Sequence, residues 1–343
     1  MNPRVLKPSQ IVHALDEYVI GQEDAKKIVS VAVYSHFKKL GRAERQGGPI
    51  VKSNILLIGP SGTGKTLLCE TLARSLDVPF VTAEATSLAQ SRFVNEEIEA
   101  ILRRLVDKAG GDIAHAQNGI VFVDEIDKLK TTGPEARSAS GESVQHALLK
   151  IMEGTKVKLG EDYIDTADIL FICGGAFVGL DEIMVQTHSF GFIATSDSDN
   201  QRILERLNSR VKPTDLFLFG LIPEFTGRLP IIARFHDLTR DMLVRILTEP
   251  RDCIHNQFVD ILRGEGVELS IAPKVFEQIA ELAIEFKTGA RSLRGLFEEL
   301  LTPVLYEIPD RQDIVRVAFT TLFAPPTLET RDAIGVAPAQ KRA

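Results

Sequence analysis

The sequence predicts an α/β protein with a parallel sheet in its larger first part and a smaller, mainly helical α+β domain after it. Short apolar runs alternate with helical patterns up to about residue 236, and such alternation is typical of a parallel sheet covered on both faces. A glycine-rich motif of the phosphate-binding type follows the first apolar run. The alternation ends near Asp237, so we predict domains at residues 1–236 and 237–322 and a disordered tail at 323–343.

The first domain is expected to begin with two helices. A helical pattern starts at Ser9 and is interrupted by Gly21, and a second helix is predicted at residues 24–40. The polar stretch at residues 41–52 is interpreted as a loop. Apolar runs then predict buried strands, with helical periodicity between them. The strands are expected at residues 54–58, 79–82, 119–123 and 169–173, and the helices at residues 67–76, 95–109 and 143–153.

The second domain is expected to be built mainly from helices. One continuous helix is predicted at residues 239–262, followed by a short strand at 267–270. Pro273 suits the first turn of a helix at 273–286. A helix at 292–306 and a strand at 314–319 complete the domain. The tail combines several prolines with little apolar periodicity, which favours disorder.

Composition excludes several classes of protein. The 343 residues carry 40 basic and 47 acidic side chains, a net charge of −7 that argues against binding nucleic acid through phosphate contacts. The three cysteines, Cys69, Cys173 and Cys253, are far apart and form no C-x-x-C pair, so no zinc module is expected. No apolar signal region and no 18-residue apolar run occurs. We therefore expect a soluble cytoplasmic protein that binds neither membrane nor nucleic acid.

The strongest motif is a phosphate-binding loop of the form G-x-x-x-x-G-K-[ST]. It lies between a predicted strand and a predicted helix that includes Leu67, which is the context the motif requires. Lys65 is expected to reach the β and γ phosphates, and the Thr66 hydroxyl to ligate Mg²⁺. The nucleotide-contacting positions are Gly59, Pro60, Ser61, Gly62, Thr63, Gly64, Lys65, Thr66 and Leu67.

A second motif places two carboxylates at the end of a buried strand. The apolar residues 120–123 run into Asp124 and Glu125. In this pattern Asp124 would hold Mg²⁺ through water, and Glu125 would polarise the water that attacks the γ-phosphate. The alternative is a strand that ends in a solvated acidic turn. We favour the catalytic interpretation because the motif follows a phosphate-binding loop in its expected context.

Two arginines are further candidates. Arg228 lies in the run LIPEFTGRLP at residues 221–230, and Arg291 lies in KTGARSLR at residues 287–294. An arginine at either place is ordinarily a solvated charge or half of a surface ion pair. Arg228 would gain a catalytic role if a neighbouring subunit presented its γ-phosphate to it. Arg291, at the start of a helix, would instead contact the nucleotide from the second domain.

These segments together resemble the AAA+ module of the ClpX family, hexameric protein unfoldases that work with the ClpP peptidase. The resemblance extends over almost the whole chain. It is carried by YVIGQEDAKK at residues 18–27, KSNILLIGPSGTGKTLLCETLARSLDVPF at 52–80, GIVFVDEIDK at 119–128, SGESVQHALLKIMEGT at 140–155, ILFICGGAF at 169–177, FGLIPEFTGRLP at 219–230 and KTGARSLR at 287–294.

The resemblance implies roles for individual residues. Val19 and Ile20 match the positions that pack on the adenine of ATP, Arg228 matches the arginine finger, and Arg291 matches the sensor-2 arginine. It also implies a homo-oligomer of six subunits with a central pore. ATP hydrolysis with Mg²⁺ would move the two domains and pull a protein substrate through that pore.

The expected pore and docking segments depart from the family pattern. Arg92, Phe93 and Val94 stand where the first pore loop has Gly-Tyr-Val, and Ser140 and Gly141 match the second pore loop. Loss of the flanking glycines is expected to stiffen the first loop. The segment at residues 156–168 is short and lacks the basic run of the family's pore-entrance loop. The expected peptidase-docking residues are Phe190, Gly191 and Phe192.

The leading hypothesis is an ATP-dependent protein unfoldase that threads substrates into a ClpP-type peptidase. The family's N-terminal zinc-binding domain has no counterpart in the sequence, so no zinc is expected. The altered pore loops motivate an alternative, a ClpX-like remodelling ATPase that acts without a peptidase. A third hypothesis, a nucleic-acid motor or clamp loader, is disfavoured by the net charge and by the lack of an aromatic cluster for base stacking.

Overall fold

The chain forms two compact units, each described here by itself. The structure is a computed structural model, and it describes residues 5–46, 52–91, 93–130, 139–188 and 210–331. The first unit consists of Met1–Leu15, Gln22–Pro60 and Lys65–His236. The second consists of Asp237–Ala343 together with two short pieces, Asp16–Gly21 and Ser61–Gly64. None of the helices in the described ranges is both long enough and apolar enough to cross a membrane.

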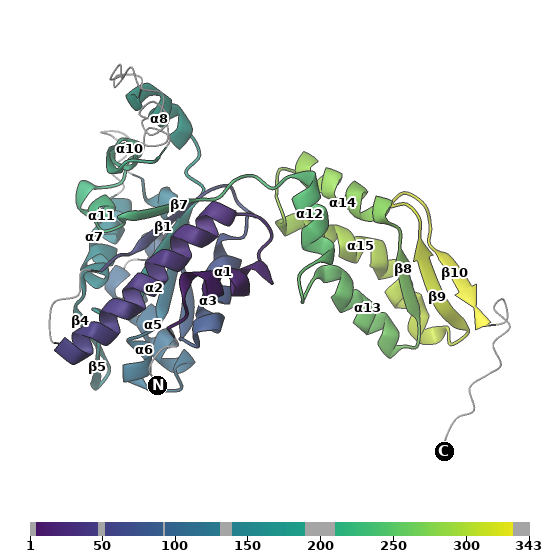
Figure 1. The fold of residues 1–343 in the computed structure, drawn as a ribbon, viewed down its shortest axis with the longest axis horizontal. Coiled ribbons are helices and arrows are strands. Elements are labelled where there is room, and N and C mark those ends of the chain that lie inside the picture. The colour runs from purple at the N-terminus through teal and green to yellow at the C-terminus, as the bar shows by residue number, and fades with distance from the viewer. Residues whose placement is uncertain (1–4, 47–51, 92, 131–138, 189–209, 332–343) are drawn as a thin grey trace. The chain divides into compact units, whose positions relative to one another are not determined.

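The first unit is built on a five-stranded parallel sheet, so the predicted fold class is confirmed (Figure 1). The strand order is β2-β3-β6-β1-β7, and every neighbouring pair is parallel. All four residues of β1 are buried, as a sheet covered on both faces requires. The strands are β1 (Ile55–Ile58), β2 (Phe80–Glu84), β3 (Ile120–Asp124), β6 (Leu170–Gly175) and β7 (Ile231–Arg234).

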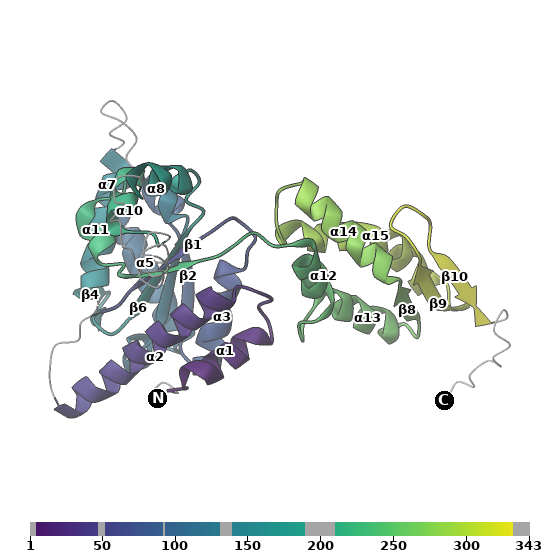
Figure 2. The ribbon, with the colours of Figure 1, turned by 45° about the horizontal axis from the view of Figure 1, so that its top comes forward.

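Helices surround this sheet, and Figure 2 shows α2 lying along the side of the first unit. α2 contacts the edge strand β7. The helices of the first unit are α1 (Pro8–Asp16), α2 (Glu23–Gln46), α3 (Lys65–Leu76), α4 (Ala85–Gln90), α5 (Val94–Lys108), α6 (Ile113–Ala116), η1 (Ile126–Leu129), α7 (Ala139–Glu153), α8 (Leu180–His188), α10 (Pro213–Phe219) and α11 (Pro223–Gly227).

Two segments of the first unit differ from the sequence prediction. The expected loop from residue 41 is wrong at its start, because α2 continues to Gln46; Ala43, Glu44 and Arg45 are good helix formers that outweigh Gly41. The short segment after α7 contains a hairpin of β4 (Lys156–Leu159) and β5 (Asp162–Asp165). Gly160 in the turn has φ +71°, a left-handed conformation that glycine adopts without strain.

The second unit packs helices on a three-stranded sheet of order β10-β9-β8. β8 and β9 are parallel, whereas β9 and β10 are antiparallel. A cluster of aromatic rings fills the core, with Phe258 and Phe297 centroids 5.5 Å apart. The elements are α12 (Arg240–Thr248), α13 (Ile254–Gly264), β8 (Glu268–Ile271), α14 (Pro273–Glu285), α15 (Arg291–Glu307), η2 (Ile308–Asp310), β9 (Ile314–Phe319) and β10 (Thr327–Thr330).

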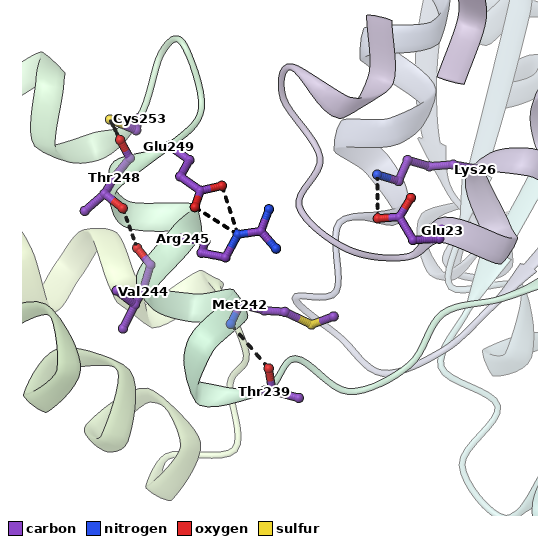
Figure 3. A network of polar contacts seen from close by, with 9 residues as sticks. All are labelled: Glu23, Lys26, Thr239, Met242, Val244, Arg245, Thr248, Glu249 and Cys253. Atoms are coloured by element: carbon purple, nitrogen blue, oxygen red, sulfur yellow. Dashed lines mark hydrogen bonds and ion pairs between the residues drawn. The ribbon is translucent and has the colours of Figure 1, made fainter. Parts of the chain in front are cut away.

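The continuous helix predicted at residues 239–262 is wrong. The structure has two helices there, and Pro250 lies between them and cannot donate a helical hydrogen bond. Figure 3 shows how the first one is capped: the Thr239 hydroxyl accepts from the Met242 amide at 3.3 Å. The Cys253 thiol donates to the Thr248 carbonyl across the break, at 3.5 Å.

The tail also differs from the expectation in one place. Residues 327–330 were expected to be disordered, but they form β10, which pairs with β9 from Thr327 opposite Ala318 to Thr330 opposite Ile314. Main-chain pairing with a strand edge requires no strong apolar pattern, so this strand gave little signal in the sequence. Residues 332–343 lie outside the described part of the chain.

Candidate functional site

The phosphate-binding motif has the local structure that it predicts. β1 ends at Ile58, and α3 begins at Lys65. Gly62 and Gly64 have φ of +77° and +97°, values that side chains other than glycine rarely adopt. Alternation of left-handed and ordinary backbone turns successive N–H groups to one side, where they form a concave site for an anion. The strand–loop–helix context is therefore confirmed.

The entrance of the loop leaves no room for a side chain at Gly59. A Cβ atom there would lie 2.5 Å from the carbonyl oxygen of Phe235, which is backbone and cannot move aside. The Gly59 amide donates to the Gly175 carbonyl at 3.1 Å, and the Phe235 amide donates to the Ile58 carbonyl at 2.7 Å. The loop therefore starts at the carboxyl ends of β1, β6 and β7, which is the edge where α/β sheets bind ligands.

Lys65 carries its charge inside this loop. Its side chain is buried, and Nζ donates to the carbonyl oxygens of Gly59 at 2.6 Å and of Pro60 at 3.0 Å. A buried ammonium is stabilised by anionic partners, and phosphate oxygens would supply them. Thr66 and Leu67, in the first turn of α3, are exposed. The glycine cradle and the enclosed ammonium thus fit a polyphosphate.

In the second unit, two of the segments that carry predicted nucleotide contacts lie against the glycines of the loop. Val19 and Ile20 are both buried, and the Val19 Cγ1 atom lies 3.8 Å from the place that a Cβ on Gly64 would take. The Ala290 amide donates to the Gly62 carbonyl at 3.2 Å. Arg291 follows as the first residue of α15 and is exposed. Segments that are far apart in the sequence therefore meet at the glycines of the loop.

The two motif carboxylates lie at the carboxyl end of β3. Asp124 Oδ1 accepts from the Glu125 amide at 2.8 Å. Glu125 has φ 59°, a left-handed conformation that is uncommon for a non-glycine residue and is found at functional sites. Glu125 Oε2 accepts from the Thr86 hydroxyl at 3.1 Å, which holds the carboxylate in one orientation. No sequence motif pointed to Thr86.

A shifted pKa links Asp124 to the helix after the phosphate loop. Burial and, second, the negative charge of Asp124 raise the pKa of the Cys69 thiol well above its usual value. Cys69 lies one helical turn after Lys65, and residues spaced in this way share a helix face. Asp124 therefore lies near α3, the helix that carries Thr66.

Asp127 is a second residue that sequence reasoning missed. It is buried, and its two carboxylate oxygens accept from the amides of Ala176 at 3.3 Å and Phe177 at 3.4 Å. A Cβ on Gly175 would lie 2.6 Å from Asp127 Oδ1. Asp127 thus fixes the turn after β6 to the end of β3. Its position within the DEID run was the only available signal.

Arg228 lies just after α11 and is paired within its own unit. Its guanidinium meets Glu153 Oε1 at 2.6 Å, and both side chains are about half exposed. The Arg228 carbonyl accepts from Asn54 Nδ2 at 3.1 Å. An exposed ion pair of this kind contributes about 0–1 kcal/mol, so it holds the arginine only weakly. The guanidinium is therefore available to a stronger anionic partner.

The expected substrate and docking residues are only partly described. Phe93 is 63 % exposed, so it is not a core residue, and its amide donates to the Ser91 hydroxyl at 3.2 Å. Val94 begins α5, and Ser140 and Gly141 lie in the first turn of α7. Gly141 is buried: a Cβ there would lie 2.9 Å from the Leu129 carbonyl oxygen. Arg92 and the docking residues Phe190, Gly191 and Phe192 lie outside the described residues.

The metal that fits this site is one that needs few protein ligands. In the described part of the chain, no group of three or more histidine, cysteine, aspartate or glutamate side chains could hold a metal ion. Mg²⁺ at nucleotide sites is held by one or two protein oxygens, waters and phosphate oxygens. The hydroxyl of Thr66 and the carboxylate of Asp124 match that donor set.

Comparison with known proteins agrees with this geometry. The family model of the AAA domain (Cdc48 subfamily) matches residues 51–232. The C-terminal, D2-small domain of ClpB protein matches residues 238–319.

Two curated relatives extend the similarity to nearly the whole chain. The ATP-dependent Clp protease ATP-binding subunit ClpX of Treponema denticola is 44% identical over 320 residues, which cover 88% of this chain and 77% of the relative. The subunit ClpX 3 of Methylococcus capsulatus is 44% identical over 344 residues, which cover 92% of this chain and 79% of that relative. The chain belongs to the ClpX family of AAA+ ATPases.

Proposed function

We propose that this chain is an ATP-dependent protein unfoldase that assembles into a hexameric ring and threads substrate polypeptides through its pore into a ClpP-type peptidase. The observation that carries the proposal is the phosphate loop with its enclosed Lys65, at the same edge of the parallel sheet as the carboxylate pair that ends β3. It supports the use of ATP as the energy source. The names of the two relatives, both subunits of an ATP-dependent Clp protease, support the peptidase partner.

ATP binding is assigned to the phosphate-binding loop and to residues outside it. The amides of residues 59–64 and the Lys65 ammonium would bind the phosphates, and Val19 and Ile20 would contact the adenine. Thr66 and Asp124 would hold Mg²⁺, which neutralises phosphate charge when bound. We assign Arg291 to the nucleotide as well, because the preceding residue already contacts the loop.

Hydrolysis is assigned to Glu125. Its carboxylate is held by Thr86 at 3.1 Å and is not fully buried, so it can orient a water molecule and accept a proton from it. The left-handed backbone at Glu125 turns the residue out of the line of β3. Arg228 would act on the γ-phosphate of a neighbouring subunit, and such arginine fingers raise kcat by about 10³–10⁵-fold.

Substrate movement is assigned to an exposed aromatic residue. Phe93 at the start of α5 would grip a polypeptide by apolar contact, together with Arg92 and Val94, and the first turn of α7 with Ser140 and Gly141 would form the second pore loop. Phe190, Gly191 and Phe192 would dock the peptidase. We place the domains at residues 1–236 and 237–322. The three free, buried cysteines support action in the reducing cytoplasm.

The hairpin of β4 and β5 favours a second candidate function. It occupies the segment where the family has a longer basic pore-entrance loop, and it exposes Lys156, Lys158 and Tyr163 instead. A protein with this entrance and a stiffened first pore loop would suit a remodelling ATPase that opens protein complexes without a peptidase. The two candidates share the ATPase and differ in the fate of the substrate.

One variant tests the shared chemistry. Glu125→Gln removes the proton acceptor but keeps the side-chain shape, so ATP should still bind while turnover falls by a factor of about 10² or more. Lys65→Ala is the matched control, because it should weaken ATP binding itself. ATP affinity by calorimetry and phosphate release by a coupled assay separate the two effects. An unchanged rate in Glu125→Gln would refute the assignment.

A folded fluorescent substrate separates the two functions. The wild-type chain is incubated with the substrate and ATP, with and without a ClpP-type peptidase. An unfoldase that feeds the peptidase degrades the substrate. Loss of fluorescence without degradation would support the remodelling ATPase. Stable fluorescence in all mixtures, while ATP is hydrolysed, would contradict both.

A further inference from the structure

We propose that Gln145 is a positioning residue that couples η1, the short helix after Glu125, to α11, the short helix that ends next to Arg228. Gln145 lies in the middle of α7 and is fully buried. It belongs to neither nucleotide motif, and its side chain is not expected to touch ATP. The proposal rests on the proposed function, because it assigns to Gln145 the alignment of two groups that act in ATP hydrolysis.

The side-chain amide of Gln145 makes one hydrogen bond as a donor and one as an acceptor. Nε2 donates to the Leu129 carbonyl at 2.9 Å, and Oε1 accepts from the Ile222 amide at 2.8 Å. The partners are backbone groups of two different elements, so the side chain joins α7 to both. Hydrogen bonds between buried groups are costly to leave unmade, because water cannot replace the lost partner. The three elements are therefore held in one arrangement.

Both partners are adjacent to residues with proposed catalytic roles. Leu129 is the last residue of η1, which begins directly after Glu125. Ile222 is the N-cap of α11, and Arg228 is its C-cap. α11 is a helix of only five residues, so a displacement of Ile222 moves Arg228 with it. Gln145 thus links the short helix that follows Glu125 to the short helix that ends next to Arg228.

α7 contacts the same two elements at its ends. In its first turn, Gly141 approaches the Leu129 carbonyl so closely that a Cβ would lie 2.9 Å away. At its last residue, Glu153 pairs with Arg228 at 2.6 Å. Asn54 joins this end too, since its Nδ2 donates to the Arg228 carbonyl at 3.1 Å. The helix therefore connects a turn that we assign to the pore with the arginine that we assign to catalysis.

This arrangement gives Gln145 a role in coupling that an apolar side chain packed at the same place would not have. A polypeptide that pushes on the first turn of α7 would shift Leu129 and Ile222 together, because one buried amide holds both. Replacing that amide should misalign Arg228 without changing the phosphate loop. The expected signature is a lower kcat for ATP at an unchanged KM, and a loss of stimulation by protein substrate.

A double-mutant cycle between Gln145 and Arg228 tests the proposal. Gln145→Met keeps a similar volume but removes both hydrogen bonds, and His146→Gln, an exposed neighbour on α7, is the control. We expect Gln145→Met to lower kcat about tenfold with KM within about twofold of wild type. In an Arg228→Ala background the same change should lower kcat less than about twofold, because the residue it aligns is gone. Radiolabelled ATP keeps the slow rates measurable.

The outcomes separate this proposal from the proposed function. If Gln145→Met lowers kcat by the same factor in both backgrounds, raises only KM, or changes nothing, the coupling role is wrong. If Arg228→Ala alone leaves kcat unchanged, the arginine-finger assignment fails instead. Should Gln145→Met not assemble, the cycle is repeated with Gln145→Glu, which keeps the acceptor for Ile222 and loses the donor to Leu129. Failure of both variants to fold would show a purely structural role.

Discussion

Acidification should destabilise the first unit through one buried histidine. His36 lies in α2 with 2% of its surface exposed, and its Nε2 atom is 3.0 Å from the Asp168 carbonyl oxygen, so the neutral ring donates there. Burial lowers the pKa of His36 from 6.5 to about 4; the charges of Lys52 and Lys39 act in the same direction, and the hydrogen bond to Asp168 opposes them.

The sign and size follow from the difference in protonation between folded and unfolded chains. Above pH 6.5 the ring is neutral in both states and has no effect. As the pH falls, the unfolded chain takes up the proton first, so the free energy of unfolding decreases until the folded state also protonates near pH 4. The full loss is about 3 kcal/mol, of which about 2 kcal/mol falls between pH 7 and pH 5.

The comparison that isolates this effect uses His36→Gln. Glutamine keeps an amide donor for the Asp168 carbonyl but does not titrate. Stability is measured by urea unfolding at pH 7 and pH 5, with far-UV circular dichroism because the chain has no tryptophan, and hydrogen exchange of α2 peptides reports on the first unit itself. His146→Gln, at a half-exposed position on α7, controls for loss of any histidine.

We expect the wild type to lose about 2 kcal/mol more than His36→Gln on going from pH 7 to pH 5. His146→Gln should follow the wild type. Parallel losses in wild type and His36→Gln would mean that His36 protonates equally in both states, which would refute the argument from burial.

Three further changes have defined outcomes. Lys65→Ala should weaken ATP binding at least about tenfold in calorimetry, because the ammonium enclosed by the loop is lost. Burial lowers the pKa of Lys52 to about 8. Between pH 8 and 10.5 the unfolded chain therefore binds more protons than the folded chain, and the free energy of unfolding of the wild type should rise with pH. Urea unfolding of Lys52→Met should show no such rise. Phe297→Ala, at a fully buried ring of the second unit, should cost about 3–5 kcal/mol in thermal unfolding.

The sheet was predictable where its strands are buried on both faces. β1, β3 and β6 are apolar runs without interruption, and such runs have few alternatives inside an α/β protein. β7 was not predicted, although it pairs directly with β1. It is an edge strand in which only Ala233 is buried, and Pro230 and Arg234 frame it. Its place in the sheet depends on β1, which local sequence does not reveal.

The predicted helix boundaries were wrong where apolar periodicity continued past a proline. Apolar residues recur at helical spacing on both sides of Pro250, so the pattern alone favoured one helix. The structure ends α12 at Thr248 and begins α13 at Ile254, with the Cys253 thiol accepting from the Asn256 amide at 3.4 Å. A proline in a helix interior costs about 3 kcal/mol. This cost outweighs the stabilisation gained by continuing the helix through residue 250. The breaker should have outweighed the pattern.

Some residues of the candidate site can be predicted from a local sequence motif. Others are recognised only from the tertiary structure. Binding a phosphate requires a fixed local backbone conformation, so the loop at residues 59–66 could be predicted from its own short sequence motif. Thr86 is hydrogen-bonded to Glu125, which lies 39 residues later in the sequence. The hydrogen bond between Asp127 and Phe177 joins residues 50 positions apart. The one between Gln145 and Ile222 joins residues 77 positions apart. No periodicity or motif connects such pairs.

In the proposed mechanism, these distant contacts also turn a nucleotide-binding loop into a site for hydrolysis. Every P-loop protein must bind phosphate, so the loop carries little information about how the reaction is controlled. In that mechanism, control depends on where Glu125 points, which the Thr86 hydroxyl fixes, and on which elements move with it. The second is set by buried side chains, such as Gln145, that bond to backbone groups of other elements. A polar group that is fully buried and satisfied on two sides, as Gln145 is, is stable only in one arrangement of its neighbours. The same property that hides Gln145 from sequence reasoning suits it to couple the pore to hydrolysis.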